Sequence, residues 1–138
     1  ATVTIIVVSI WQNIGFLMII YTAGLQTIPK DVMESAELDG CSGLKKVLKI
    51  ELPLLMPTVT INLFVSISGA FKSFDIPNAM TGGGPYGSTM PVAMNIYQEA
   101  FTKYNLGYGS ANSVILFLTV AAVTLIQLYC TRKKEVEY

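Results

Sequence analysis

The longest uncharged runs of the chain constrain its fold more than any other feature. Residues 1–25, 52–71 and 104–131 contain no Asp, Glu, Lys or Arg. About 20 apolar residues in a helix, each rising about 1.5 Å, cross a hydrocarbon core roughly 30 Å thick. Three such runs in 138 residues leave too little polar surface to cover them in water. The sequence therefore predicts an all-α, polytopic membrane helix bundle with three spans.

The composition supports a membrane protein and argues against an enzyme. Charged residues make up 13% of the chain, whereas soluble domains carry about a quarter. The net charge of zero gives no support for a nucleic-acid partner. The absence of histidine removes the commonest general base and zinc ligand, and no nucleophile stands beside a base. Cys41 and Cys130 have no metal or redox spacing, so we expect two reduced thiols, no metal and no cofactor.

The uncharged runs divide the chain into alternating spans and loops. We expect spans at 1–25, 52–71 and 110–131, a loop at 26–51, an outer segment with a short helix at 72–109, and a tail at 132–138. Residues 1–25 lack the basic start of a signal peptide, so we expect the chain to begin inside or just before a membrane helix.

The basic residues predict the orientation of the spans. Seven of them belong to the 26–51 loop and the tail, namely Lys30, Lys45, Lys46, Lys49, Arg132, Lys133 and Lys134. The 72–109 segment has only Lys72 and Lys103. Basic residues concentrate on the cytoplasmic side of membranes. The 26–51 loop and the C-terminus are therefore predicted to be cytoplasmic.

The 26–51 loop contains the stretch "ESAELDG", residues 34–40, with acids at Glu34, Glu37 and Asp39. We expect two short helices, capped by Thr27 or Ser42 and joined by a left-handed turn at Gly40. Lysines in the second helix would suit an amphipathic connector on anionic lipid, as in a non-transport scaffold or assembly subunit. The acids favour the other interpretation, because an anionic leaflet repels them and a basic protein partner attracts them.

The spacing of this loop resembles the EAA loop of ABC-importer membrane subunits. The matching residues are Glu34-Ser35-Ala36, Asp39-Gly40, Ile50 and Leu52-Pro53, with Ser35 where the family pattern has alanine. The resemblance implies that a cytoplasmic ATPase receives the loop and moves it. Its coupling residues would be Glu34 facing a basic residue, Ser35, Ala36 at the cleft floor, Asp39, and Gly40 at the turn.

Three later stretches, "TGGGPYGST", "IYQEAF" and "GYGSANSVILFL", resemble the sugar-permease branch of that family. The likeness covers residues 1–138 and implies the C-terminal half of a six-helix permease core in a prokaryotic plasma or inner membrane. It also implies a second permease subunit, an extracytoplasmic solute-binding protein and a sugar or polyol substrate. The chain has no P-loop, so ATP would be bound and hydrolysed by a separate subunit.

The outer segment contains "GGGPYG", residues 82–87, which matches the spacing of a dinucleotide fingerprint. Pro85 and the preceding membrane helix argue against a nucleotide site. We expect a turn-rich loop, either near the binding protein or serving only as a tight reversal. A following face is expected to pack on neighbouring helices and comprises Ala93, Ile96, Tyr97, Ala100 and Phe101.

The second span has a stripe of small and polar residues that repeats every three or four positions. Its members are Asn62, Ser66, Gly69, Ala70 and Ser73. Small residues favour close packing of helices, and the family resemblance alternatively places the stripe on the wall of the substrate path. Further uncharged polar residues, which are expected to face the bundle interior, are Ser9, Gln12, Asn13, Asn112, Thr119, Thr124 and Gln127.

Overall fold

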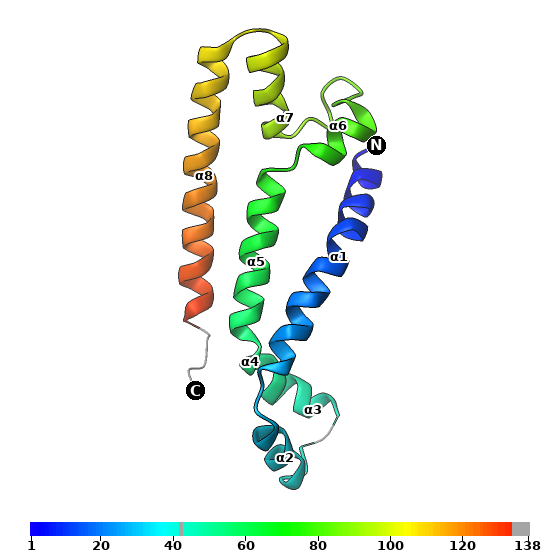
Figure 1. Cartoon of the computed structure of the whole chain (residues 1–138), viewed down its shortest axis with the longest axis vertical. Coiled ribbons are helices and arrows are strands. Elements are labelled where there is room, and N and C mark those ends of the chain that lie inside the picture. Colours follow the sequence, from blue (N-terminus) through cyan, green and yellow to red (C-terminus); the bar gives the residue numbers. More distant parts are fainter. Residues whose placement is uncertain (42, 134–138) are drawn as a thin grey trace. The chain divides into compact units, whose positions relative to one another are not determined.

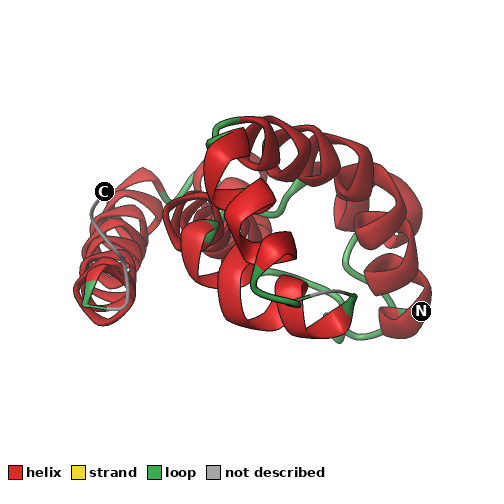
Figure 2. Ribbon diagram, turned by 90° about the horizontal axis from the view of Figure 1, so that it is seen from below, coloured by secondary structure: helices red, strands yellow, loops and turns green. Residues whose placement is uncertain are grey.

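The structure, a computed structural model, describes residues 1–41 and 43–133, which form helices joined by turns and loops (Figure 2). The helices in chain order are α1 Thr2–Gln26, α2 Lys30–Leu38, α3 Leu44–Lys46, η1 Val47–Glu51, α4 Leu52–Leu54, α5 Met56–Phe71, α6 Asp75–Thr81, α7 Val92–Tyr97, η2 Gln98–Thr102 and α8 Leu106–Arg132 (Figure 1). No strand occurs in the described ranges. The predicted all-α class is confirmed.

Within residues 1–41 and 43–133, two helices are long and apolar enough to cross a membrane. They are α1, with 25 residues, and α8, with 27 residues. Helix α1 matches the first predicted span closely, whereas α8 begins at Leu106, inside the segment assigned to the outer loop. Most of their large apolar side chains are exposed, including Trp11 at 78% and Phe117 at 71%. Such surfaces suit contact with lipid or with other membrane helices.

The second predicted span is sharply bent at its start. The segment Leu44–Leu54 and helix α5 meet at an angle of 68°, and the pair qualifies as a third span only if both parts are counted together. Pro57 explains the bend, because it has no N–H to donate to the carbonyl of Pro53 and its ring crowds that carbonyl. Residues 52–54 therefore belong to the arm before the bend, and the straight part of the span is α5.

The chain forms two compact units. The first comprises Ala1–Ile14 and Val65–Leu125. Its most buried large side chain is Met94, which is 1% exposed. The rings of Phe74 and Tyr97 are 5.1 Å apart, and those of Tyr97 and Phe101 are 5.2 Å apart. Tyr97 therefore contacts Phe74, which directly precedes α6, and Phe101 one turn farther along the chain.

The second unit comprises Gly15–Phe64 and the described part of Ile126–Tyr138. Gly24 of α1 lies so close to Thr58 of α5 that a Cβ at Gly24 would overlap the Thr58 side chain. Gln127 of α8 donates its Nε2 hydrogen to the Thr60 carbonyl oxygen, 3.4 Å away. Small and polar residues thus join the three helices within this unit, as in other membrane bundles.

Candidate coupling loop and solute path

The predicted coupling residues occupy a short helix and its C-terminal turn. Helix α2 begins after Pro29, whose ψ of 134° is extended, and no side chain caps it. The predicted cap at Thr27 is wrong, because its hydroxyl donates to the Gly24 carbonyl oxygen at 2.7 Å and so completes the end of α1. Ser42, the other predicted cap, lies outside the described residues.

The left-handed turn predicted at Gly40 is confirmed. Gly40 has φ of +75°, a conformation that costs glycine nothing and other residues about 1–2 kcal/mol. The Gly40 N–H donates to the Glu37 carbonyl at 3.0 Å, and the Cys41 N–H donates to the Ala36 carbonyl at 2.9 Å. These bonds satisfy carbonyls that the end of a helix would otherwise leave free.

The predicted coupling residues differ in exposure. Glu34, Ser35, Asp39 and Gly40 are exposed, whereas Ala36 is only 6% exposed. The structure therefore presents the acids Glu34 and Asp39 to solvent and buries Ala36 against its own chain. A partner that approaches this loop would meet a negatively charged surface.

An ion pair that the sequence interpretation missed connects the two sides of the turn. The Lys46 Nζ of α3 lies 2.6 Å from the Glu37 Oε1 of α2. The hydrogen bond from Lys46, reinforced by its charge, lowers the pKa of Glu37. The ion pair is therefore present at neutral pH and is lost only as the pH falls through this lowered pKa. The sequence could have indicated this ion pair, because it places acids before the predicted glycine turn and lysines after it.

The predicted solute-path residues lie on α5 or just beyond its end, and their environments differ. Asn62 is 3% exposed, whereas Ser66, Gly69 and Ala70 are exposed. No atom of the described chain lies within 4 Å of a Cβ built on Gly69. Within this chain the stripe is therefore not tightly packed at Gly69. Ser73 lies beyond the end of α5 at Phe71, so the single helical face ends before it.

Asn62 is the most unusual member of the stripe. Neither its Nδ2 nor its Oδ1 has a hydrogen-bond partner among the described residues, although both atoms are buried. An unsatisfied buried amide costs about 1–3 kcal/mol. Such a group can be retained because another molecule or another conformation supplies its partner.

The other polar residues of the spans mostly bond to their own helices. Ser9 and Thr119 each donate a hydroxyl hydrogen to a carbonyl four residues earlier, at 2.8 Å. Asn13 donates its side-chain amide to the Ser9 carbonyl, also at 2.8 Å. Local bonding of this kind satisfies polar groups in apolar surroundings. Gln127 is the exception, since it reaches Thr60 on α5.

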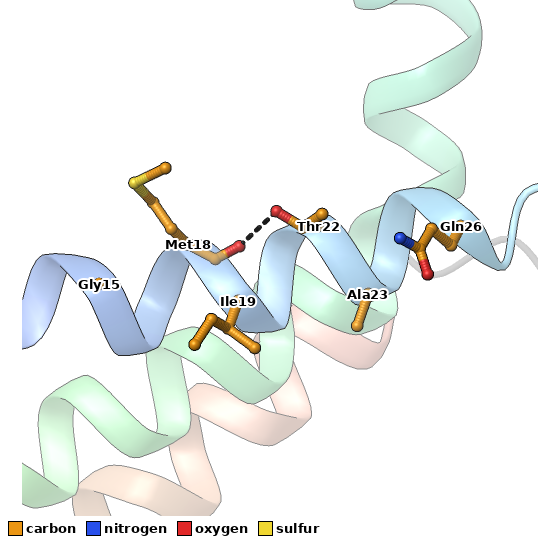
Figure 3. A pocket seen from close by; sticks show the side chains of 6 residues that line it. All are labelled: Gly15, Met18, Ile19, Thr22, Ala23 and Gln26. Carbon is orange, nitrogen blue, oxygen red and sulfur yellow. Dashed lines mark hydrogen bonds between the residues drawn. The ribbon is translucent and has the colours of Figure 1, made fainter.

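A pocket of about 400 Å³ follows one face of α1 (Figure 3). Its lining residues are Gly15, Met18, Ile19, Thr22, Ala23 and Gln26. The Thr22 hydroxyl is already occupied, since it donates to the Met18 carbonyl at 2.8 Å. All six residues come from a single helix, so the pocket is a hollow on the helix surface, and we assign no ligand to it.

The loop between α6 and α7 is closed by side-chain hydrogen bonds. The Thr89 hydroxyl donates to the Gly84 carbonyl at 2.7 Å, and the hydroxyl oxygens of Thr81 and Thr89 are also 2.7 Å apart. Gly82, Gly83 and Gly87 all have positive φ. Tyr86 has φ of 54° and is fully exposed at 106%. The expected turn-rich loop is confirmed, and it presents one aromatic ring to solvent.

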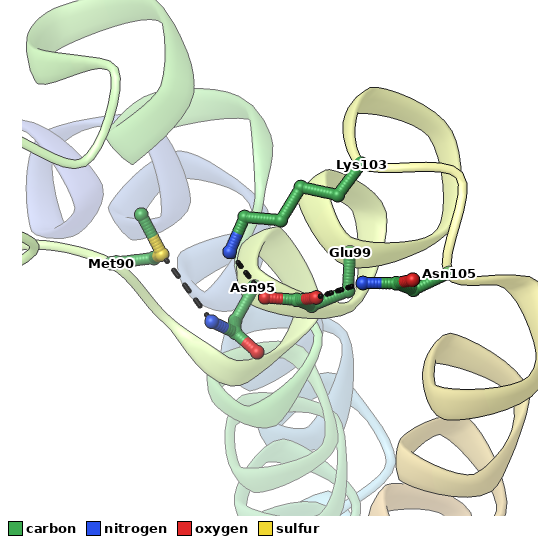
Figure 4. Close-up of polar contacts among 5 residues, drawn as sticks. All are labelled: Met90, Asn95, Glu99, Lys103 and Asn105. Atoms are coloured by element: carbon green, nitrogen blue, oxygen red, sulfur yellow. Dashed lines mark hydrogen bonds and ion pairs between the residues drawn. The ribbon is translucent and has the colours of Figure 1, made fainter.

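A second ion pair lies between η2 and the start of α8 (Figure 4). Glu99 accepts hydrogen bonds from the Lys103 Nζ at 2.5 Å and from the Asn105 Nδ2 at 3.3 Å. These bonds, that of Lys103 first, lower the pKa of Glu99. Nearby, Asn95 donates to the Met90 Sδ at 3.6 Å. This network fixes the turn that precedes α8.

These features define a helical membrane protein in which an acidic helical loop separates two hydrophobic segments. The chain belongs to the family of binding-protein-dependent transport system inner membrane components, whose sequence model matches residues 1–136. The resemblance to the sugar-permease branch of the ABC importers is thereby confirmed.

Similarity to individual relatives extends over nearly the whole chain. The chain is 38% identical over 133 residues to a probable starch degradation products transport system permease protein of Thermoanaerobacterium thermosulfurigenes, and this match covers 96% of the chain and 46% of that protein. The chain is 37% identical over 131 residues to an sn-glycerol-3-phosphate transport system permease protein of Brucella abortus, a match that covers 94% of the chain and 45% of that protein. It is 36% identical over 132 residues to a putative ABC transporter permease protein of a Caldicellulosiruptor species, where the match covers 96% of the chain and 94% of that protein. The chain thus spans about half the length of the first two relatives.

Proposed function

We propose that the chain is part of a permease subunit of an ABC importer that moves a sugar or related polyol across the membrane by alternating access. The family match over residues 1–136 carries this proposal. Two relatives bear names that refer to starch degradation products and to sn-glycerol-3-phosphate. The subunit itself catalyses no reaction. The cytoplasmic loop transmits ATP-driven movement, and the spans form the route of the solute.

The docking partner of the loop is a cytoplasmic ATP-binding subunit with a basic cleft. The exposed carboxylates of Glu34 and Asp39 support this assignment, because they lie close together on a short segment outside the apolar spans. Complementary charge sets the orientation of such a contact and excludes wrong partners. Exposed Ser35 and Gly40 border the contact, and buried Ala36 lies beneath it.

The solute passes along α5, with Ser66, Gly69, Ala70 and Ser73 on the wall of the path. Small and hydroxyl side chains leave space for a sugar and can hydrogen-bond its hydroxyl groups. The buried amide of Asn62 supports this proposal, since its unpaired atoms are suited to a polar solute or to water.

The remaining partners follow from the same function. A second permease subunit and lipid cover the exposed apolar faces of α1 and α8. A solute-binding protein docks on the outer side, where Tyr86 offers a large ring held by a closed loop. In this topology the C-terminus is cytoplasmic, and the protein is located in the plasma or inner membrane of a prokaryote.

The test is to purify the complete transporter from its native membrane and compare the wild type with Glu34→Lys. We expect an ATP-binding subunit to accompany the wild type. Glu34→Lys places a positive charge against the basic cleft, so we expect at least a tenfold loss of that subunit or of solute-stimulated ATPase activity, on the order of the cost of disrupting a charged contact.

Asp75→Lys is the matched control, because it makes the same change of charge at an exposed acid on the outer side. It should leave the ATP-binding subunit in place. If no ATP-binding subunit accompanies the wild type, or if Glu34→Lys behaves like Asp75→Lys, the docking proposal is wrong. The loop would then be a connector at the lipid surface, as in a scaffold or assembly subunit.

A further inference from the structure

The Glu37–Lys46 ion pair joins two elements that the chain otherwise connects through a turn. Glu37 is near the end of α2, and Lys46 ends α3. The Lys46 side chain is only 15% exposed, whereas that of Glu37 is 63% exposed. The lysine is therefore held largely by its surroundings, and the carboxylate reaches it from the solvent side. Neither residue belongs to the predicted ATPase-coupling set.

The two glycines of the turn beneath this ion pair have open space around them. Gly40 and Gly43 have φ of +75° and +60°, and no described atom lies within 4 Å of a Cβ built on either residue. Glycine has the greatest backbone freedom of any residue. Without a contact between the two sides, the angle between α2 and the following helix would be free to change at these glycines.

The segment after the turn is a continuous helical arm. It comprises α3, η1 and α4, which together run from Leu44 to Leu54. The Leu55 N–H donates to the Glu51 carbonyl and the Val59 N–H to the Leu55 carbonyl, both at 2.9 Å, so backbone hydrogen bonds continue through the bend into α5. A displacement of Lys46 would therefore be transmitted to the helix that contains the proposed solute path.

We propose that Glu37 and Lys46 are a positioning pair that makes the coupling loop rigid. The ion pair prevents movement at Gly40 and Gly43, so that an ATP-driven displacement of α2 moves the 44–54 arm and α5. This inference rests on the proposed function, because the force comes from the docked ATPase. It adds a role for two residues that are not in the predicted ATPase-coupling set.

The expected effect is on coupling and not on folding. Ion pairs that are exposed to solvent contribute little to stability. Moreover, Lys at position 37 would lie near the negative C-terminal end of α2, and Glu at position 46 would lie in the first turn of α3, where the helix dipole favours a negative charge. Charge reversal at either position should therefore leave both helices formed and replace the attraction between the two side chains with repulsion.

The experiment compares four variants of the complete transporter in lipid vesicles, with its ATPase and binding protein. They are Glu37→Lys, Lys46→Glu, the double exchange of both, and the control Lys45→Glu. Lys45 is exposed, precedes Lys46, and forms no ion pair among the described residues. The measurements are the amount of bound ATPase, the ATPase rate with and without loaded binding protein, and the solute imported per ATP.

We expect each single variant to retain the ATPase and to import about two- to fivefold less solute per ATP, a change in keeping with the modest strength of an exposed pair. The double exchange should restore the wild-type value, and Lys45→Glu should match the wild type. Equal behaviour of the single variants and Lys45→Glu would overturn the inference. A double exchange that fails to restore coupling would also overturn the inference, because that result would mean that Glu37 and Lys46 each have a separate partner.

A second measurement tests the rigidity of the loop without the ATPase. Spin labels at Leu38→Cys and Leu48→Cys, after Cys41 and Cys130 are changed to Ser, report the distance between α2 and the arm by pulsed EPR. We expect a narrow distance distribution with Glu37 and Lys46 present, a broad one with Lys46→Glu, and a narrow one again after the double exchange. An unchanged distribution in Lys46→Glu would disprove the positioning role even if the docking proposal holds.

Discussion

The 26–54 loop and the 72–105 segment both combine short helices, glycine turns and an acid–lysine ion pair, but they are built differently. In the 26–54 loop the ion pair connects residues nine positions apart on two elements. In the 72–105 segment Glu99 and Lys103 are four positions apart, and Asn105 adds a further bond to Glu99. The first pair fixes an angle between elements, and the second reinforces a local turn.

The glycines of the two regions differ only in part. Gly40 and Gly43 have no neighbour within 4 Å of a Cβ, and the same holds for Gly82 and Gly87 in the 72–105 segment. In the 72–105 segment, a Cβ on Gly83 would lie 2.9 Å from the Met90 Cε. Gly109, at the start of α8, would place its Cβ 2.8 Å from the Ala100 Cβ. The 72–105 segment is therefore closely packed at Gly83 and Ala100, whereas the turn of the 26–54 loop has open space at both of its glycines and is bridged by an ion pair.

This difference suggests a division of roles. A region held by packing keeps its shape when a single contact is lost, because close-packed side chains resist displacement. A region held by an ion pair over open glycines can transmit or release movement when that pair changes. We therefore expect the 72–105 segment to act as a fixed platform and the 26–54 loop as a moving part.

The expected roles of the 26–54 loop and the 72–105 segment require that the two regions lie on opposite sides of the membrane. With Cys41 and Cys130 changed to Ser, single cysteines at Leu38→Cys and Tyr86→Cys occupy sites that are 89% and 106% exposed. We expect a membrane-impermeant thiol reagent, applied to sealed cells, to label Tyr86→Cys fully and Leu38→Cys only after permeabilisation. Labelling of both from outside would refute the predicted orientation.

Packing in the 72–105 segment can be tested with two glycines of α8. Gly109→Ala would force a Cβ against Ala100, so we expect the free energy of unfolding to fall by about 1–3 kcal/mol, as for other overpacked sites. Gly107→Ala is the matched control, because nothing lies within 4 Å of its Cβ position. In a helix that change should stabilise by roughly 0.5–1 kcal/mol. Thermal unfolding in detergent measures both, and effects of the same sign would contradict the packing.

The smallest expected effect is on the pKa values of the Glu37 and Glu99 carboxylates. Both pKa values are lowered, so each ion pair contributes stability above the ordinary glutamate pKa and loses it as the pH falls through the lowered one. Lys46→Met removes both the hydrogen bond and the positive charge that lower the pKa of Glu37, so this pKa should return to the ordinary value. Lys103→Met leaves the Asn105 bond, so the pKa of Glu99 should rise only in part. Carboxyl ¹³C shifts followed by NMR against pH measure both, and a full return at Glu99 would exclude Asn105 as a partner.

Much of the fold could be predicted because lipid imposes a simple rule. A chain must satisfy its backbone hydrogen bonds within each span, so long uncharged runs become helices. Helices α1 and α8 match two of these runs, and Gly40 takes the predicted left-handed turn. The EAA spacing from Glu34 to Gly40 depends only on residue order, and the family that it indicated is confirmed by the match over residues 1–136.

Three sequence predictions were wrong, one about the partner of a hydroxyl group and two about where a helix bends or ends. Thr27 was expected to cap α2 but bonds to Gly24 instead, since a hydroxyl can serve either helix. The 52–71 run is uncharged throughout, yet Pro57 divides it and the straight helix starts at Met56. Ser73 falls on the periodic stripe, but α5 has already ended at Phe71. Periodicity alone does not show where a helix bends or stops.

The sequence by itself determined the helical class, the uncharged spans, the position of the acidic loop and the family, because these depend on the order and polarity of residues along the chain. Only the tertiary structure decided that Ala36 is buried, that both polar atoms of Asn62 lack a partner among the described residues, and that Glu37 pairs with Lys46. Those facts depend on which side chains meet across turns and between helices. Several lysines were available to Glu37 on charge alone, and the geometry of the folded loop selects one of them.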